Sequence, residues 1–242
     1  WYRGVKGELC LCMGGYAGFR AVYDEYGREI RRMGFDVHGN PALIRDGYAE
    51  YRNEYDERGN LTAVRYFDES GEPCCGTPLK VAGGTMEYDN RGNKVAECFY
   101  GTDGCPILCR DGYARWEADY DERGNVLANR FYGVNGEPCL CIDGNASVSV
   151  EYDAYGREVR KVWRDVNGNP ILRREGFAEQ RGSYDERGNL LEVRYYGADG
   201  KLILHKDGFA ISRSEYDARG NQTAERYYGA DEKPCLRTEG YA

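Results

Sequence analysis

The sequence predicts an all-β protein built from tandem units of 32 residues, stacked as an elongated array of β-hairpins or a β-solenoid. Three observations lead to this fold class. A Tyr-Asp pair followed by Gly recurs along the 242 residues, and each interval carries three turn signals. The segments between the turns run for about six to eight residues, which suits strands and is too short for stable helices.

The Tyr of the Tyr-Asp pair marks the register of the repeat. It stands at Tyr23, Tyr55, Tyr88, Tyr120, Tyr152, Tyr184 and Tyr216. The steps are 32 residues, except for one of 33 in the third unit, which carries an extra residue around Gly76 to Pro78. We therefore expect a single repeat array over residues 1–242, with units starting at residues 1, 33, 65, 98, 130, 162 and 194 and a partial eighth unit at 226–242. A start at Trp1, without Met, reads as a segment of a larger protein.

Each unit is expected to turn three times. The first turn is the Asp-x-x-Gly pattern, as in Asp56 to Gly59, where Asp accepts backbone N–H groups and Gly takes a positive φ. The second turn ends at Gly39, Gly71, Gly104, Gly136, Gly168 and Gly200. The third is the Asp-Gly before an aromatic residue, at Gly47, Gly112 and Gly208.

Alternation along the strands assigns their faces, because successive side chains point to opposite sides. An Ala column is predicted to face inward: Ala17, Ala49, Ala82, Ala114, Ala146, Ala178, Ala210 and Ala242. The same face takes the aromatic column Tyr66, Phe99, Phe131, Trp163, Tyr195 and Tyr227. A second aromatic column, one residue later, is then expected to be exposed on the opposite face.

A unit of 32 residues cannot bury a sizeable core alone, so its stability must come from stacked neighbours. The first and last units end alike, with GGYA at Gly14 and EGYA at Glu239. This half-unit overhang favours an elongated stack over a closed propeller.

Composition excludes several classes of protein. The 41 acidic and 33 basic residues, net charge −8, are interleaved, so there is no basic stripe for nucleic acid. The longest apolar run, Leu9 to Met13, is far too short to cross a bilayer, so no membrane insertion is expected. The 22 tyrosines supply the apolar area of a core that is poor in aliphatic residues.

No catalytic or metal constellation emerges from the motifs. The two histidines, His38 and His205, occupy different repeat positions, and no GxSxG, HExxH or phosphate-binding glycine loop is present. We therefore predict no enzyme, no cofactor and no metal site. The seven turn Asp residues could line a calcium ladder, but capping of their own turns is the favoured interpretation.

The ten cysteines fit a core better than a disulfide framework. Cys10, Cys74, Cys139 and Cys235 share a repeat position with Ala42, Ile107, Ile171 and Ile203, which favours reduced packing residues. Cys109 and Cys141 occupy one position in adjacent units and could form a disulfide if stacking brings them close. The two Cys-Leu-Cys triplets lack the spacing and the His partner of a metal site.

The strongest candidate binding site is the second aromatic column. Its members are Phe35, Phe67, Tyr100, Tyr132, Tyr196 and Tyr228, beside Arg65, Arg130, Arg194 and Arg226. Periodic flat rings next to arginines can stack on sugar rings or hold a quaternary amine. The alternative is structural, because aromatic ladders also stabilise sheets, with rings packed against neighbouring arginines.

Two family resemblances bear on this choice. YDERGNLT at Tyr55 to Thr62, with YDERGN again at Tyr120 and Tyr184, resembles the YD repeat of bacterial rearrangement-hotspot proteins and teneurins. That resemblance implies hairpins wound into a structural or encapsulating sheet. RYFDESGEP at Arg65 and RYYGADGK at Arg194 resemble the aromatic cell-wall-binding repeats of Gram-positive surface proteins and clostridial toxins. That resemblance implies rings that hold choline or glycans.

We expect a noncatalytic repeat region of a bacterial surface or secreted protein that binds a repetitive carbohydrate or cell-wall ligand through one weak aromatic site per unit. The first alternative is a purely structural YD-type shell, stalk or spacer. A second is a protein-interaction module that adds strands at an open end of the array and self-associates with rising concentration. The extracellular or cell-surface location follows from the resemblances.

Overall fold

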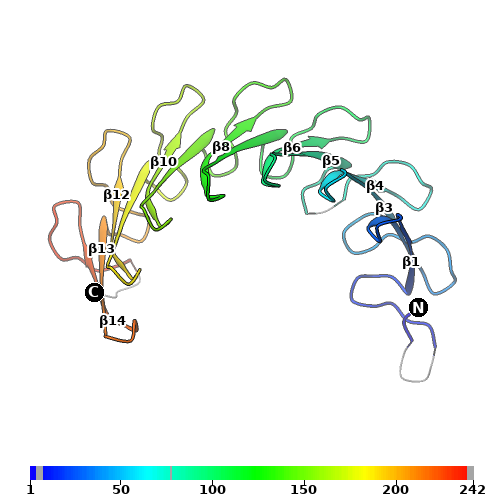
Figure 1. The fold of residues 1–242 in the computed structure, drawn as a ribbon, viewed down its shortest axis with the longest axis horizontal. Helices are drawn as coiled ribbons and strands as arrows, with labels where there is room; N and C mark the ends of the chain where they lie inside the picture. The colour runs from blue at the N-terminus through cyan, green and yellow to red at the C-terminus, as the bar shows by residue number, and fades with distance from the viewer. Residues whose placement is uncertain (4–7, 77, 239–242) are drawn as a thin grey trace. The chain divides into compact units, whose positions relative to one another are not determined.

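The computed structural model describes residues 1–3, 8–76 and 78–238 of the chain. Ala242 and the EGYA segment at 239–242, expected to end the partial eighth unit, lie outside the described residues, as do residues 4–7 and 77. The named strands in the described part alternate with tight turns and longer loops, as Figure 1 shows. The part of the chain that the structure describes contains no helix long and apolar enough to span a membrane.

The strands form one antiparallel sheet whose strand order follows the chain from β1 to β14. Each Tyr-Asp turn joins the two strands of a hairpin. The strands are β1 (Gly18–Tyr23), β2 (Glu29–Phe35), β3 (Glu50–Tyr55), β4 (Leu61–Phe67), β5 (Gly83–Tyr88), β6 (Lys94–Tyr100), β7 (Arg115–Tyr120), β8 (Val126–Tyr132), β9 (Ser147–Tyr152), β10 (Glu158–Arg164), β11 (Glu179–Tyr184), β12 (Leu190–Tyr196), β13 (Ile211–Tyr216) and β14 (Gln222–Tyr228). The predicted all-β class of tandem hairpins is confirmed.

The chain divides into two compact units. The first unit comprises Trp1–Glu117 and Tyr132–Glu137 and contains β1 to β6. The second comprises Ala118–Phe131 and Pro138–Ala242 and contains β9 to β14.

The hairpin turn forms as its sequence predicts. The Asp56 Oδ1 atom accepts N–H groups from Arg58 at 2.9 Å and Asn60 at 2.8 Å, while Oδ2 accepts the Asn60 side-chain amide at 2.9 Å. Gly59 takes a φ of 90° and donates its N–H to the Asp56 carbonyl. The register then shifts between Glu54 and Tyr55, as in a hairpin closed by a bulge.

The second and third turns also have glycine at positive φ, with two exceptions. Gly71 (φ 86°) and Gly47 (φ 83°) represent the two types. Lys80 (φ 60°) replaces the third-turn glycine in the unit with the extra residue, and Glu232 (φ 59°) replaces the last second-turn glycine. These two side chains occupy backbone geometry that favours glycine.

The predicted Ala column is buried, and its described members are 0–5% exposed. Each Ala links two hairpins through its backbone. The N–H of Ala82 donates to the Tyr100 carbonyl of its own hairpin, and its carbonyl accepts the N–H of Tyr66 from the preceding hairpin, both at 2.8 Å. A larger side chain has no room at this junction.

The Tyr of the Tyr-Asp pair joins its hairpin to the preceding one. The hydroxyl of Tyr88 donates to the Leu61 carbonyl at 2.9 Å, and that of Tyr216 donates to the Leu190 carbonyl at 3.1 Å. The turn arginines add a second link, because Arg58 Nη1 donates to the Asn90 carbonyl at 2.9 Å and Arg187 Nη1 to the Ala218 carbonyl at 2.7 Å. The repeat motif therefore builds both the turn and the contact between successive turns.

This role of the Tyr hydroxyl can be measured. Tyr88→Phe is expected to lower the free energy of unfolding by about 1 kcal/mol, because the Leu61 carbonyl loses its donor while the ring remains. Tyr23→Phe is the matched control, since the Tyr23 hydroxyl donates to Glu29 of its own hairpin and the residue is 54% exposed. Urea unfolding of both variants provides the comparison. Equal decreases in the free energy of unfolding of the two variants would contradict a specific role of the Tyr88 hydroxyl in linking the hairpins.

The core is a ladder of aromatic rings beside the loops that connect the hairpins. In the second unit, ring centroids lie 5.2 Å apart for Trp163 and Phe177, 4.6 Å for Phe177 and Tyr195, 5.8 Å for Tyr195 and Phe209, and 4.8 Å for Phe209 and Tyr227. Strand residues of the predicted inward column alternate here with loop residues from the third turn. The inward prediction for that column is confirmed.

Candidate functional site

The second aromatic column, predicted to be exposed, is not. Phe35 and Phe67 are buried, at 7% and 9% exposure, and Tyr100, Tyr132, Tyr196 and Tyr228 are half-buried. The expectation of free rings on this face is therefore wrong. Alternation placed them correctly opposite the core, but that placement alone does not say what covers them.

Arginines of the same hairpins cover several of these rings. The Arg52 guanidinium lies 3.9 Å from the Phe67 ring centroid, and Arg181 lies 4.4 Å from that of Tyr196. Arg213 lies 4.6 Å above Tyr228. A cation this close to a ring face is attracted by the ring quadrupole. These contacts take up ring faces that the binding hypothesis assigned to a ligand.

Buried glutamates hold two of these arginines, Arg52 and Arg181, in place. Glu50 is fully buried and accepts hydrogen bonds from Arg31 at 2.6 and 2.8 Å and from Arg52 at 2.5 Å. Burial alone would raise the pKa of Glu50, but the hydrogen bonds from Arg31 and Arg52 outweigh it and keep the pKa below its ordinary value. Glu179 makes the same contacts with Arg160 and Arg181. We call each such set of three residues an Arg–Glu–Arg triad.

The four arginines of the binding hypothesis also have protein partners. Arg65 bonds Glu54 at 2.9 Å, and Arg194 bonds Glu192 at 2.6 Å. Arg130 pairs with Asp119 and Arg226 with Glu215, in each case across the two strands of one hairpin. These side chains contribute to an ion-pair lattice on the face opposite the core.

At the third hairpin, three small residues stand at the positions of the triad. The register positions of Arg31, Glu50 and Arg52 are taken there by Ala63, Gly83 and Thr85, as the strand pairings and the repeat offset show. A Cβ on Gly83 would lie 2.4 Å from the Val64 carbonyl oxygen, so this position requires glycine. The loss of three large side chains leaves a groove over β4, β5 and β6.

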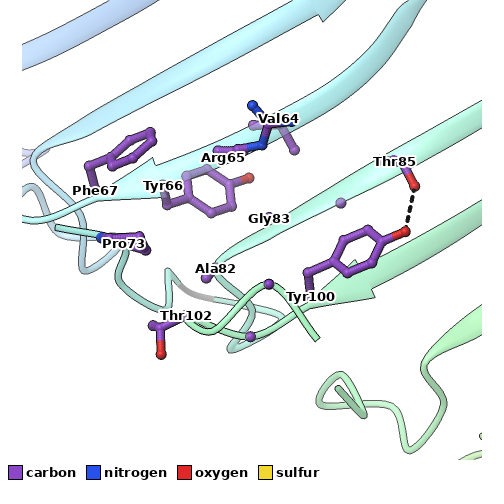
Figure 2. Close-up of a pocket in the computed structure, with 13 residues that line it drawn as sticks. Val64, Arg65, Tyr66, Phe67, Pro73, Ala82, Gly83, Thr85, Tyr100 and Thr102 are labelled. Atoms are coloured by element: carbon purple, nitrogen blue, oxygen red, sulfur yellow. Dashed lines mark hydrogen bonds between the residues drawn. The ribbon is translucent and has the colours of Figure 1, made fainter. Parts of the chain in front are cut away.

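This groove is a candidate ligand site. Its volume is about 330 Å³, at the lower end for small-ligand sites. Figure 2 shows the rings of Phe67 and Tyr100 on its two sides, with Gly83 between them. Thr85 Oγ1 lies 3.2 Å from the Tyr100 hydroxyl. Of the ten predicted binding residues, the groove brings together Arg65, Phe67 and Tyr100.

The groove offers binding chemistry but no acid–base constellation. The residues that line it include hydroxyls of Thr85, Thr102 and Tyr100 and the Arg65 guanidinium, and among these described residues there is no carboxylate, His or Cys. The sequence pattern indicates the two rings but not the groove. The signal for the groove was the Gly-Gly pair at Gly83, because the first strands of the two neighbouring hairpins carry a charged residue at the position of Gly83.

The turn aspartates cap their turns, as the favoured interpretation predicts. Asp185 Oδ1 accepts N–H groups from Arg187 and Asn189, and Oδ2 accepts the Asn189 amide at 2.8 Å. The Asn189 side chain, and then the backbone donors, lower the pKa of Asp185. Within the described residues, no group of three or more His, Cys, Asp or Glu side chains is arranged to hold a metal ion.

The cysteines are free thiols, including Cys109 and Cys141. Cys74 Sγ lies 3.7 Å from the Gly47 carbonyl, and Cys235 Sγ makes the same contact with Gly208. Burial raises the pKa of both thiols. These contacts fit packing residues that link successive third turns.

Neither histidine lines the groove. His38 sits in an exposed second turn, where its N–H donates to Asp36. His205 packs into the ring ladder, with centroids 4.9 Å from Tyr195 and 5.6 Å from Phe209. Burial lowers the pKa of His205. Both therefore act in local structure.

The fold and the turn chemistry define the class: a tandem β-hairpin repeat protein whose hairpins turn on a Tyr-Asp motif. No protein-family model and no curated protein sequence matches the chain.

Solved toxin structures do match it. A structure of the Photorhabdus luminescens Tc holotoxin pore is 14% identical, with a TM-score of 0.39, over 88% of this chain and 10% of that chain. A crystal structure of TcdB2-TccC3 is 11% identical, with a TM-score of 0.36, over 90% of this chain and 14% of that chain. The chain thus spans only a small fraction of the chains it matches.

Proposed function

We propose that this chain is a noncatalytic structural segment, a YD-type wall or spacer, of a bacterial secreted or surface protein. One observation carries the proposal: the residues that define the repeat are used in contacts within and between hairpins. The Asp caps the turn, the Tyr hydroxyl bonds the preceding hairpin, and arginines cover the outer rings. The extracellular location rests on the resemblance of the YDERGN motifs to YD repeats.

A test separates this role from multivalent carbohydrate binding. Tyr196→Ala and Tyr228→Ala each remove a ring covered by an arginine, at 4.4 and 4.6 Å. We expect each change to lower the free energy of unfolding by about 1–3 kcal/mol, because a half-buried ring is lost and its arginine is uncovered. Unfolding curves of the variants would be compared with parallel binding to a glycan and cell-wall array.

Binding by the parent chain, with no binding by variants of unchanged stability, would overturn the structural proposal. Loss of stability without any array signal from the parent supports it. A variant of Tyr26, which is 74% exposed in a hairpin turn, serves as a control for changes to a surface ring.

The second candidate function is binding of a single sugar-like ligand in the groove of the third hairpin. The specific observation is the pair of rings, Phe67 and Tyr100, that flank Gly83 where the triad is absent. Tyr100→Phe would remove the groove hydroxyl while keeping the ring. Tyr132→Phe is its matched control, since the Tyr132 hydroxyl bonds Glu117 at 3.1 Å. Array binding lost only in the first variant would support this candidate.

A further inference from the structure

An exposed leucine recurs once per repeat in the loop between hairpins. It follows the position of the bridged Pro by two residues, and its exposure ranges from 44% to 62%. The members are Leu11, Leu43, Leu108, Leu140, Leu172, Leu204 and Leu236, with the exposed Cys75 at this position in the third repeat. We call this set the leucine column.

The loop backbone determines this exposure. In the sixth repeat, Ile171 donates its N–H to the Trp163 carbonyl at 3.0 Å, and Arg173 donates to the Phe177 carbonyl at 3.0 Å. The Arg173 side chain lies over the Trp163 ring, 4.8 Å from its centroid. Because side chains alternate along an extended segment, Leu172 between them faces away from the core.

The column places apolar area where a repeat protein would otherwise carry polar side chains. In the second unit, Leu140, Leu172, Leu204 and Leu236 are joined by Ile142, which is 58% exposed. Five side chains about half exposed present on the order of 400 Å² of apolar surface, the size of patches that mark interaction sites. A single exposed leucine needs no explanation, but a regular series does.

Charges of both signs flank the column. Arg174 and Lys206 follow Leu172 and Leu204 by two residues and are exposed, and the Asp143 carboxylate is 48% exposed. An apolar centre with a mixed polar rim is the usual composition of a protein–protein interface. The carboxylates and the net charge of −8 disfavour an anionic membrane as the partner.

We propose that the second-unit part of the leucine column, from Leu140 to Leu236, is the docking surface for a second copy of this chain. Each repeat adds two strands, so the leucines recur at about 9.6 Å, and a second copy presents the same spacing. An antiparallel pairing about a two-fold axis would set Leu172 against Leu204 of the other copy, with the exposed Arg174 and Lys206 at the rim. The two columns would together bury about 800 Å² of apolar surface, and their polar rims must supply the remainder of the roughly 1,200 Å² that a specific dimer requires.

The test is sedimentation velocity of the whole chain over a range of concentrations. The parent chain is expected to dimerise, and the double variant Leu172→Glu/Leu204→Glu to weaken dimerisation at least about 100-fold, because it places carboxylates at the centre of the interface. Val166→Glu is the matched control, since Val166 is 45% exposed but lies in a second turn outside the column. It should dimerise like the parent.

Three outcomes would overturn the proposal. They are a parent chain that stays monomeric at every concentration, association that survives the double variant, and equal weakening by Val166→Glu. Survival would indicate pairing at a sheet edge instead. Flotation with phosphatidylcholine and phosphatidylserine vesicles adds a further arm, in which vesicle binding by a monomeric parent assigns the column to a lipid surface. Thermal unfolding checks that the variants remain folded.

Discussion

Phe177→Ala is expected to lower the free energy of unfolding by about 3–5 kcal/mol, because it removes a ring from the middle of the aromatic ladder. Phe177 is 3% exposed, and its ring lies 5.2 Å from Trp163 and 4.6 Å from Tyr195. Arg173 also contacts the ring, at 5.7 Å from its centroid. The cavity would separate the stacked cores of two successive repeats, whose stability depends on their shared interface.

Urea unfolding and amide hydrogen exchange check this prediction. Exchange should rise most in β10 to β13, the strands around the ladder position. Tyr155→Ala is the control, because Tyr155 is also aromatic and in the second unit but is 78% exposed. Tyr155→Ala should lower the free energy of unfolding by no more than about 1 kcal/mol, mainly because the contact with Arg157 is lost. A similar loss in both variants would show that the ladder is not the principal core.

Acid is expected to remove about 3 kcal/mol of stability through one carboxyl group. Bidentate hydrogen bonds from Arg32, at 2.6 and 2.7 Å, together with the Tyr51 hydroxyl, lower the pKa of Glu29 from 4.5 to about 2. The folded state therefore stabilises the ionised form of Glu29 more than the unfolded chain does. Its contribution is fully present above pH 4.5 and is lost as the pH falls toward about 2.

Glu29→Gln tests this account. At neutral pH the variant should be about 3 kcal/mol less stable than the parent, and the difference should close as the pH approaches 2. Chemical unfolding at a series of pH values measures it. Glu54→Gln breaks an exposed pair with Arg65 and should cost less than about 1 kcal/mol at neutral pH. A difference in unfolding free energy between the parent and Glu29→Gln that stays constant with pH would show that ionisation of Glu29 is not its cause.

The local chemistry of each repeat could be predicted from its residues. Asp-x-x-Gly specified the hairpin turn because Asp56 bonds only residues within four positions and Gly59 needs only its own φ. Alternation likewise placed Ala82 and Phe99 in the core. These features depend on neighbours in sequence, and tandem repetition shows them many times over.

The state of the second aromatic column could not be predicted in this way. Phe67 is covered by Arg52, which Glu50 holds from the same face. Whether a ring is free or covered depends on the conformations of such long side chains. The two-residue alternation of a strand predicts the face of a side chain but not its conformation. The same holds for the groove, which lies where Thr85 and Gly83 of β5 pair with Ala63 and Arg65 of β4.

The residues alone therefore established the all-β class, the 32-residue period, the turns and the inward column, because each rests on backbone geometry set within a few positions. The covering of the outer rings, the groove beside Gly83 and the exposure of Leu172 were settled by packing between strands and loops. Those features arise from side chains distant in sequence, whose contacts exist only once the hairpins have stacked.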